Sequence, residues 1–171
     1  RYENFKQLQL YCYRAASVVG LLSARIFGFT NKDTLKYAHD LGIALQLTNI
    51  IRDLGEDAHR GRIYVPLDLL DQFSLTEDDI LSSKRNGKLT LLVKHLGDQA
   101  NDFYRSAMRR LPKEDVRKQL PGLIMGNIYY ALLRKVVSNE PDNILNISTG
   151  LSPIKKILVA TTTFFGMSWI K

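Results

Sequence analysis

The stretch QLTNIIRDLGED, residues 46–57, places polar side chains at helical spacing inside an otherwise apolar segment. Its stripe consists of Gln46, Asn49, Asp53 and Asp57, separated by three, four and four residues. At about 100° of rotation per residue these positions share one narrow face of a helix, with leucine and isoleucine on its flanks. Such a stripe is ordinary if it faces water, and it indicates a binding site if it faces the interior.

The stripe carries the ligand atoms that Mg²⁺ prefers, namely amide and carboxylate oxygens, with water and substrate phosphates completing the shell. We therefore predict that Asn49, Asp53 and Asp57 bind a metal and that Gln46 orients substrate or water. Spacing alone supports a solvent-facing polar edge equally well. The inward interpretation is favoured because the acidic residues fall at the end of the expected helix, where the macrodipole disfavours anions and a cation would compensate.

Basic residues accompany the stripe. Arg52, Arg60 and Arg62 lie within or just after it and are suited to phosphate oxygens. The whole chain has a formal charge of +7, which favours an anionic partner such as a phosphate-bearing substrate or a lipid surface. Because no basic block is interleaved with aromatic residues in a recognisable module, we do not expect nucleic-acid binding.

Periodicity along the chain predicts an all-α protein, with one domain over residues 1–171. The expected helices cover residues 2–27, 31–57, 66–73, 76–83, 89–111 and 114–138, and a last one begins at Ser152 and Pro153. Residues 139–150 are expected to form a loop. Four expected local features are an end at Gly28, a capping box of Thr30 with Asp33, an N-cap at Thr76 and a kink at Pro121 and Gly122.

The single cysteine, Cys12, excludes an internal disulfide and indicates a reducing compartment, so we expect a cytoplasmic protein with Cys12 as a buried packing residue. The apolar run ILVATTTFFGMSWI, residues 157–170, is 14 residues long and too short for the ~20 residues that span a bilayer. Its first interpretation is a core helix. Its second is an interfacial contact that would hold the protein at the inner membrane surface.

Three motifs together resemble one known family. QLTNIIRDLGEDAHRGRIYVP, residues 46–66, resembles the second aspartate-rich signature of the squalene/phytoene synthases. YCYRAASVVG, residues 11–20, resembles their other signature, and MGNIYYALL, residues 125–133, resembles a later helix. The resemblance implies an isoprenoid synthase helical bundle. It is strongest to the bacterial hopanoid-pathway branch, the presqualene diphosphate/squalene synthases.

The activity implied by the resemblance is a Mg²⁺-dependent head-to-head condensation of two farnesyl diphosphates. It gives presqualene diphosphate and pyrophosphate, and further reaction to squalene would need NADPH, for which no glycine-rich dinucleotide fingerprint appears. The alternative within the family is a phytoene or dehydrosqualene synthase of carotenoid biosynthesis. An alternative of another class is a non-catalytic helical scaffold, which would have no reason to keep the stripe in register.

Site residues follow from the resemblance position by position, and small residues at 15–19 would leave room for a prenyl chain. Tyr11, which by itself could be an ordinary interfacial tyrosine, matches a residue that handles protons or steadies cations. The implied catalytic residues are Tyr11, Asp53, Asp57 and Arg52, the implied metal ligands are Asn49, Asp53 and Asp57, and the implied substrate-binding residues are Gln46, Asn49, Arg62, Tyr129, Lys155 and Lys156. The two lysines could equally be a solvated helix start.

One feature of the family pattern is missing from the sequence. Members carry two aspartate-rich motifs on facing helices. This chain shows only the second, and the first normally lies well upstream. We therefore expect the chain to correspond to the C-terminal part of the bundle, with the N-terminal part upstream or on a separate chain. Alone, it should be inactive and should expose faces meant for burial.

Overall fold

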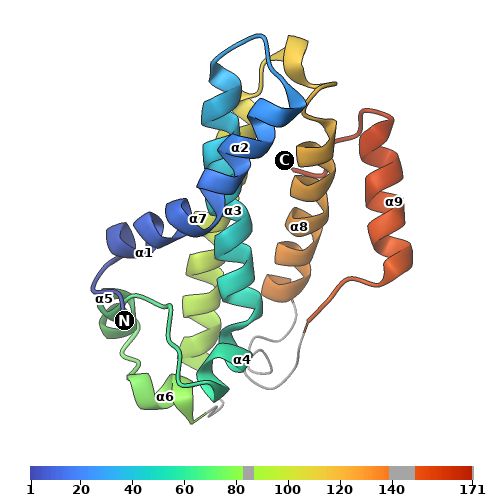
Figure 1. Cartoon of the computed structure of the whole chain (residues 1–171). Helices are drawn as coiled ribbons and strands as arrows, with labels where there is room; N and C mark the ends of the chain where they lie inside the picture. Colours follow the sequence, from blue (N-terminus) through green and yellow to red (C-terminus); the bar gives the residue numbers. More distant parts are fainter. Residues whose placement is uncertain (83–86, 139–148, 171) are drawn as a thin grey trace.

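The computed structural model describes residues 1–82, 87–138 and 149–170, and every regular element in these ranges is helical (Figure 1). The all-α prediction is therefore confirmed. The elements are α1 (Phe5–Cys12), a π-helical turn (Tyr13–Ser17), α2 (Val18–Phe27), α3 (Asp33–Arg52), α4 (Leu54–His59), α5 (Leu67–Gln72), α6 (Glu77–Leu81), α7 (Gly87–Arg110), a 3₁₀ turn (Lys113–Asp115), α8 (Leu120–Ser138) and α9 (Pro153–Phe164).

Helix α3 is the central element of the bundle. It packs against α7, α2 and α8, and twelve of its 20 residues are buried, as expected for a helix surrounded by others. The π-helical turn approaches α3 closely at Gly42, where a Cβ would lie 2.6 Å from the Cα of Ser17. The Ser17 hydroxyl donates to the carbonyl of His39 at 2.8 Å and fixes this crossing. The crossing places α2 alongside α3 and so positions one wall of the site.

The start of α3 differs from the predicted capping box of Thr30 with Asp33. The helix begins at Asp33, whose backbone N–H donates to the Asn31 side chain at 2.9 Å. The Thr30 N–H donates instead to the buried carboxylate of Asp115 at 2.7 Å. Burial raises the pKa of Asp115, but hydrogen bonds from Thr34 and from the backbone of Asn31 and Thr30 outweigh it and hold the pKa at about 2. A partner 85 residues away therefore displaced the local cap.

Other helix ends follow local chemistry. As predicted, Gly28 ends α2 with φ +82°, Thr76 is the N-cap of α6, and the Ser152 hydroxyl accepts from the backbone of α9. Asp79 adds a capping box with Thr76 that the sequence analysis did not predict. The predicted kink at Pro121 is wrong because α8 begins at Leu120, so the proline lies in its first turn, where no helical hydrogen bond is lost. The predicted loop lies largely outside the described residues, at 139–148.

Helix α9 corrects the prediction of a core helix. It packs against α8 through Val159 and Thr163, which are its buried residues (Figure 1). Most of its large apolar side chains, including Ile154 and Phe165, are exposed. The hydropathy of the run was correctly recognised, but it does not show which face is covered. None of the helices in the described ranges is long and apolar enough to cross a bilayer.

Candidate functional site

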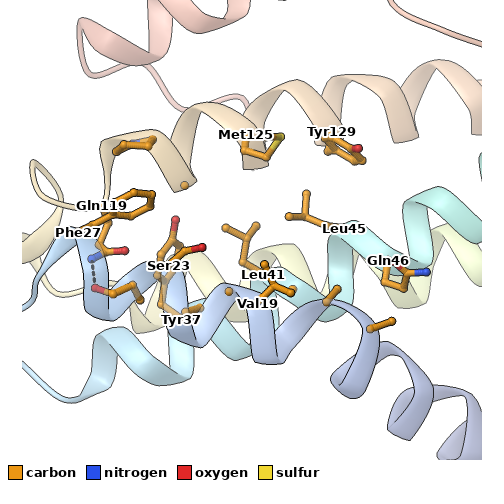
Figure 2. A pocket seen from close by; sticks show the side chains of 18 of the residues that line it. Val19, Ser23, Phe27, Tyr37, Leu41, Leu45, Gln46, Gln119, Met125 and Tyr129 are labelled. Atoms are coloured by element: carbon orange, nitrogen blue, oxygen red, sulfur yellow. Dashed lines mark hydrogen bonds between the residues drawn. The ribbon is translucent and has the colours of Figure 1, made fainter.

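A cavity of about 410 Å³ lies between α2, α3 and α8 (Figure 2). Its walls are mostly apolar, with Leu41 and Leu45 from α3 and Met125 from α8. Ala15, Ala16 and Val19 also line it, as the sequence predicted for small residues along the first helix. The space is elongated along α3, with Phe27 and Gln119 toward one end and Gln46 and Tyr129 toward the other (Figure 2).

The polar end of the cavity is formed by the first two residues of the stripe. Gln46 and Asn49 both line the space, so these two face inward as predicted. The Asn49 side-chain oxygen is buried and has no hydrogen-bond partner among the described residues. A buried amide oxygen without a partner is costly to the fold, and this one is therefore a candidate ligand atom.

The stripe continues past a local break in the helix. At Asp53 the backbone leaves helical geometry, with φ −96° and ψ 10°, although its N–H still donates to the Asn49 carbonyl at 2.8 Å. The Asp53 carboxylate receives two hydrogen bonds from Arg52, Nε to Oδ1 at 2.6 Å and Nη2 to Oδ2 at 2.5 Å. The hydrogen bond to Asp53 and, less strongly, an interaction with Tyr129 raise the pKa of Arg52. Arg52 therefore links the carboxylate to the Tyr129 wall of the cavity.

Asp57 lies one turn further, on α4, and is half-buried. Burial raises its pKa, the nearby Asp53 charge raises it further, and Arg62 and Arg60 act in the opposite direction. Arg60 is paired with Glu56 at 2.7 Å, whereas Arg62 is exposed and donates its backbone N–H to the Asp57 carbonyl at 2.8 Å. Two like charges in a partly desolvated setting favour a cation between them.

These residues fit part of a magnesium site. Within the described ranges no group of three or more histidine, cysteine, aspartate or glutamate side chains is placed to hold a metal. The available donors are one unpartnered amide oxygen, Asn49, and the carboxylates of Asp53 and Asp57. They are hard oxygen ligands of the kind that Mg²⁺ takes together with water and phosphate oxygens. Arg52 competes for Asp53, so the described residues offer an incomplete coordination shell.

Tyr11 lies outside the cavity lining, in a cluster of three tyrosine rings. Its ring centroid is 5.6 Å from that of Tyr2 and 5.2 Å from that of Tyr64. Burial, followed by a hydrogen bond with Tyr64, raises the pKa of Tyr11 to about 12. The phenol is therefore neutral at physiological pH and available as a proton donor or acceptor. Its neighbour Cys12 is fully buried, as predicted.

Lys155 and Lys156 lie in the first turn of α9, exposed and outside the cavity lining. The structure therefore does not place Lys155 and Lys156 beside Gln46 and Asn49 at the polar end of the cavity. The far end contains two residues that the sequence analysis missed. The Tyr37 hydroxyl is buried without a partner in the described ranges, and the Gln119 side chain donates to the carbonyls of Ala24 and Gly28. Tyr37 precedes Gln46 by nine residues, about 180° around an ideal helix, so it does not lie on the stripe and the spacing of the stripe gives no signal for it.

Comparison with known proteins extends the similarity beyond the motifs. The family model for squalene/phytoene synthase matches residues 1–155. The chain is 38% identical over 149 residues to phytoene synthase 2, chloroplastic, of Solanum lycopersicum, covering 84% of this chain and 48% of that protein. It is 33% identical over 185 aligned positions to 15-cis-phytoene synthase of Synechocystis sp., covering 100% and 52%. The chain spans about half the length of these curated relatives.

Solved structures show the same helical arrangement. A dehydrosqualene synthase in complex with ligand superposes with a TM-score of 0.74 at 24% identity, covering 96% of this chain and 58% of that one. Squalene synthase HpnC from Alicyclobacillus acidocaldarius superposes with a TM-score of 0.68 at 28% identity, covering 81% and 54%. The first shows the fold, an isoprenoid synthase bundle. Because the family model covers most of its length, this chain belongs to the squalene/phytoene synthase family.

Proposed function

We propose that this chain carries the prenyl cavity and one aspartate-rich half of the active site of a prenyltransferase that condenses two prenyl diphosphates head to head. The observation that carries the proposal is the polarity of the cavity. Apolar side chains line its length, and Gln46 and the unpartnered Asn49 oxygen occupy one end. A long hydrocarbon with an anionic head matches this gradient, because the tail leaves water while the head meets polar groups and cations.

In this proposal different residues of the chain bind the diphosphate head and the prenyl tail of the substrate. The tail lies along α3 in a space that excludes water. Arg52, Arg62 and Tyr129 hold diphosphate oxygens, and Gln46 orients the head. The allylic C–O bond breaks with its electron pair leaving on pyrophosphate. The double bond of the second substrate then attacks the cation, and loss of a proton closes a cyclopropane ring.

Asn49, Asp53 and Asp57 would hold Mg²⁺, which when bound supplies positive charge that stabilises the leaving diphosphate. Before substrate arrives, Asp53 is held by the Arg52 guanidinium. In the proposed site Arg52 would bind phosphate oxygens as well as Asp53, and the Asp53 carboxylate would then be available to hold Mg²⁺. The side chains of Arg52 and Asp53 are 28% and 31% exposed, so both interactions would strengthen once bound substrate excludes water from them.

We further propose that the remaining metal ligands and the remaining cavity wall come from a protein segment outside this chain. Two observations support this. The donors in the described ranges make an incomplete shell, and α2 exposes apolar side chains, Leu22 and Ile26 among them, beside the cavity wall. On this proposal the 171-residue chain alone does not turn over substrate, and its activity appears with the complementary segment.

The product is a finer part of the proposal. The curated relatives at 33–38% identity are phytoene synthases, which favours the phytoene alternative, made from two geranylgeranyl diphosphates. Squalene synthase HpnC, at 28% identity, keeps presqualene diphosphate from two farnesyl diphosphates as the second candidate. We place phytoene first because these relatives are more similar to the chain. A later reduction with NADPH applies to the second candidate alone.

The test uses the native protein that contains this chain, supplied with Mg²⁺ and labelled farnesyl or geranylgeranyl diphosphate. Products are separated by chromatography, and pyrophosphate release is measured in parallel. Asp53→Asn and Asp57→Asn are each expected to lower turnover by at least a hundredfold, whereas Asp98→Asn, at an exposed position on α7, should have no effect. Turnover near the unchanged level in both stripe variants would refute the role of these carboxylates, and no turnover by the unchanged native protein would favour the non-catalytic scaffold.

A further inference from the structure

The Tyr37 side chain crosses the cavity from one wall to the other. It starts on α3, and its hydroxyl ends against Gly122 on α8, where a Cβ built on the glycine would lie 3.1 Å from the hydroxyl oxygen. Figure 2 places Tyr37 between Leu41 on one side and Phe27 with Gln119 on the other. Because Tyr37 is only 1% exposed, its ring has no open solvent to swing into. The ring therefore separates the long main part of the cavity from a short end space.

Hydrogen bonds fix the walls on either side of Tyr37. The Gln119 side chain, just before α8, donates to two backbone carbonyls at the end of α2, at 3.2 and 2.9 Å. The Thr34 hydroxyl, one turn before Tyr37 on α3, donates at 2.7 Å to the buried carboxylate of Asp115, in the segment that leads into α8. Helices α2, α3 and α8 are thus tied together here, and this end of the cavity has a fixed width.

The length of the cavity up to Tyr37 can be compared with that of prenyl chains. Asn49, at the polar end, and Tyr37 are twelve residues apart on α3, which at about 1.5 Å per residue is about 18 Å. A fully extended chain advances about 1.2 Å per bond, so the sixteen main-chain carbons of a geranylgeranyl group span about 18 Å and the twelve of a farnesyl group about 13 Å. A geranylgeranyl chain therefore reaches Tyr37, whereas a farnesyl chain ends about one helical turn short of it, near Leu41.

We propose that Tyr37 determines the length of the prenyl chain that the cavity accepts, by stopping a geranylgeranyl chain at its ring. The inference rests on the proposed function, since it takes the cavity as the site of a prenyl tail, and it adds the chain length and the residue that sets it. A farnesyl chain leaves the space before Tyr37 unfilled and buries less apolar surface. A geranylfarnesyl chain, one isoprene unit longer, meets the ring before its diphosphate head reaches Asn49.

The test measures binding, so its result does not depend on turnover. The native protein that contains this chain is titrated in a calorimeter, with Mg²⁺, against non-reactive thiolodiphosphate analogues of farnesyl, geranylgeranyl and geranylfarnesyl diphosphate. The geranylgeranyl analogue should bind about tenfold or more tightly than either of the others, because the shorter chain buries fewer carbons and the longer one meets the ring. Tyr37→Leu removes the ring, opens the end space and should shift the preference to the geranylfarnesyl analogue.

Three further variants make the test specific to the ring of Tyr37. Leu41→Phe fills the space just before Tyr37 and should shift the preference in the opposite direction, to the farnesyl analogue. Tyr37→Phe keeps the ring and should keep the preference for the geranylgeranyl analogue. The matched control is Tyr130→Leu, because Tyr130 is also buried and lies on α8 but outside the cavity lining. It should leave the order of the three affinities unchanged.

The outcomes distinguish this inference from the proposed function. If the native protein binds none of the three analogues, both are refuted. If it binds them and turns over prenyl diphosphates but prefers another chain length, the inference alone fails. An unchanged preference in Tyr37→Leu, or in Leu41→Phe where the first variant does not fold, would overturn the assignment of Tyr37 and leave the proposed function standing. A shift in Tyr37→Phe as large as that in Tyr37→Leu would overturn stopping by the ring.

Discussion

Replacing Asn49 by leucine should stabilise the fold while removing function. The Asn49 side-chain oxygen is buried and has no partner in the described ranges. Such atoms are few in folded proteins, because their lost hydration is not compensated. Of the four in the described residues, Tyr37 and Asn49 line the cavity, whereas Gln99 and Asn101 do not. A ligand-binding residue can keep such an atom, since the ligand supplies the missing partner. The substitution therefore separates the two roles.

The magnitude follows from two contributions. An unsatisfied buried polar group costs about 1–3 kcal/mol, and leucine lacks that group. Leucine is also a better helix former than asparagine, by up to about 0.5 kcal/mol, at a position inside α3. Allowing for imperfect fit of the branched side chain in the cavity, the free energy of unfolding should rise by about 1–2 kcal/mol. For a chain of this size that corresponds to an increase of about 2–8 °C in Tm.

The assay is thermal unfolding of Asn49→Leu beside a neighbouring control. Thr48 is fully buried, and its hydroxyl donates to the Ala44 carbonyl at 2.8 Å and lies 3.0 Å from the Tyr104 hydroxyl. Thr48→Val leaves the buried Tyr104 phenol unpaired and should lower stability by about 1–3 kcal/mol. These two adjacent substitutions both replace a polar side chain by an apolar one, yet they are expected to change the free energy of unfolding in opposite directions.

The functional readout is the shift in Tm caused by Mg²⁺ with pyrophosphate in the native protein. A ligand at 100 times its Kd stabilises by about 2.7 kcal/mol, and Asn49→Leu should lose most of that shift. If Asn49→Leu melts at or below the temperature of the unchanged protein, the oxygen has a partner and the reasoning fails. A full ligand shift in the variant would refute the assignment of Asn49 as a ligand.

Three further predictions concern the scaffold. Gly42→Ala should lower the free energy of unfolding by about 1–3 kcal/mol in denaturant titration, because the added Cβ meets the backbone of Ser17 at 2.6 Å, whereas Gly150→Ala meets nothing within 4 Å and should be neutral. Because the pKa of Asp115 is lowered from 3.8 to about 2, its ionised form contributes fully to the free energy of unfolding above pH 3.8, and this contribution is lost as pH falls toward about 2. The free energy of unfolding of Asp115→Asn should therefore depend less on pH across this window. Because the pKa of Tyr11 is raised from 10.0 to about 12, its phenol should stay neutral at pH 10, and its contribution to stability should be lost only as pH rises from 10.0 toward about 12. Absorbance titration beside Tyr11→Phe measures this pKa. A Tyr11 phenolate at pH 10 would contradict the prediction.

Helix type and order could be predicted because apolar periodicity persists along most of the chain. Helix ends were predictable where the signal was local, as at Gly28, whose positive φ favours glycine, and at Thr76, which caps its own helix. They failed where a distant group competed. Thr30 carries a plausible capping pattern, but Asp115 takes its backbone N–H. The hydropathy of a sequence likewise cannot reveal that most apolar side chains of α9 are exposed.

The candidate site was predictable to the same extent. The spacing of Gln46 and Asn49 places both in the cavity, because one helix determines their relative direction. The ion pair of Arg52 with Asp53 was not foreseen, since it depends on the backbone break after α3. Tyr37 was missed because it does not share the face of the stripe, so its hydroxyl stood out only once the packing of α8 against α3 was known.

The two sides of α3 explain why the same helix serves both the fold and the site. Toward α7, its polar atoms are satisfied, as the contact of Thr48 with Tyr104 illustrates. Toward the cavity, Tyr37 and Asn49 keep buried oxygens that have no partner among the described residues, near opposite ends of the space. Packing alone favours apolar residues at both positions. Gln99 and Asn101 on α7 also carry buried side-chain oxygens without a partner in the described ranges, so a missing partner alone does not identify a ligand. On α3, however, both such oxygens line the cavity, which is the pattern expected of a helix whose one face is shaped by a ligand. The cavity is therefore better explained as a binding site than as a packing defect.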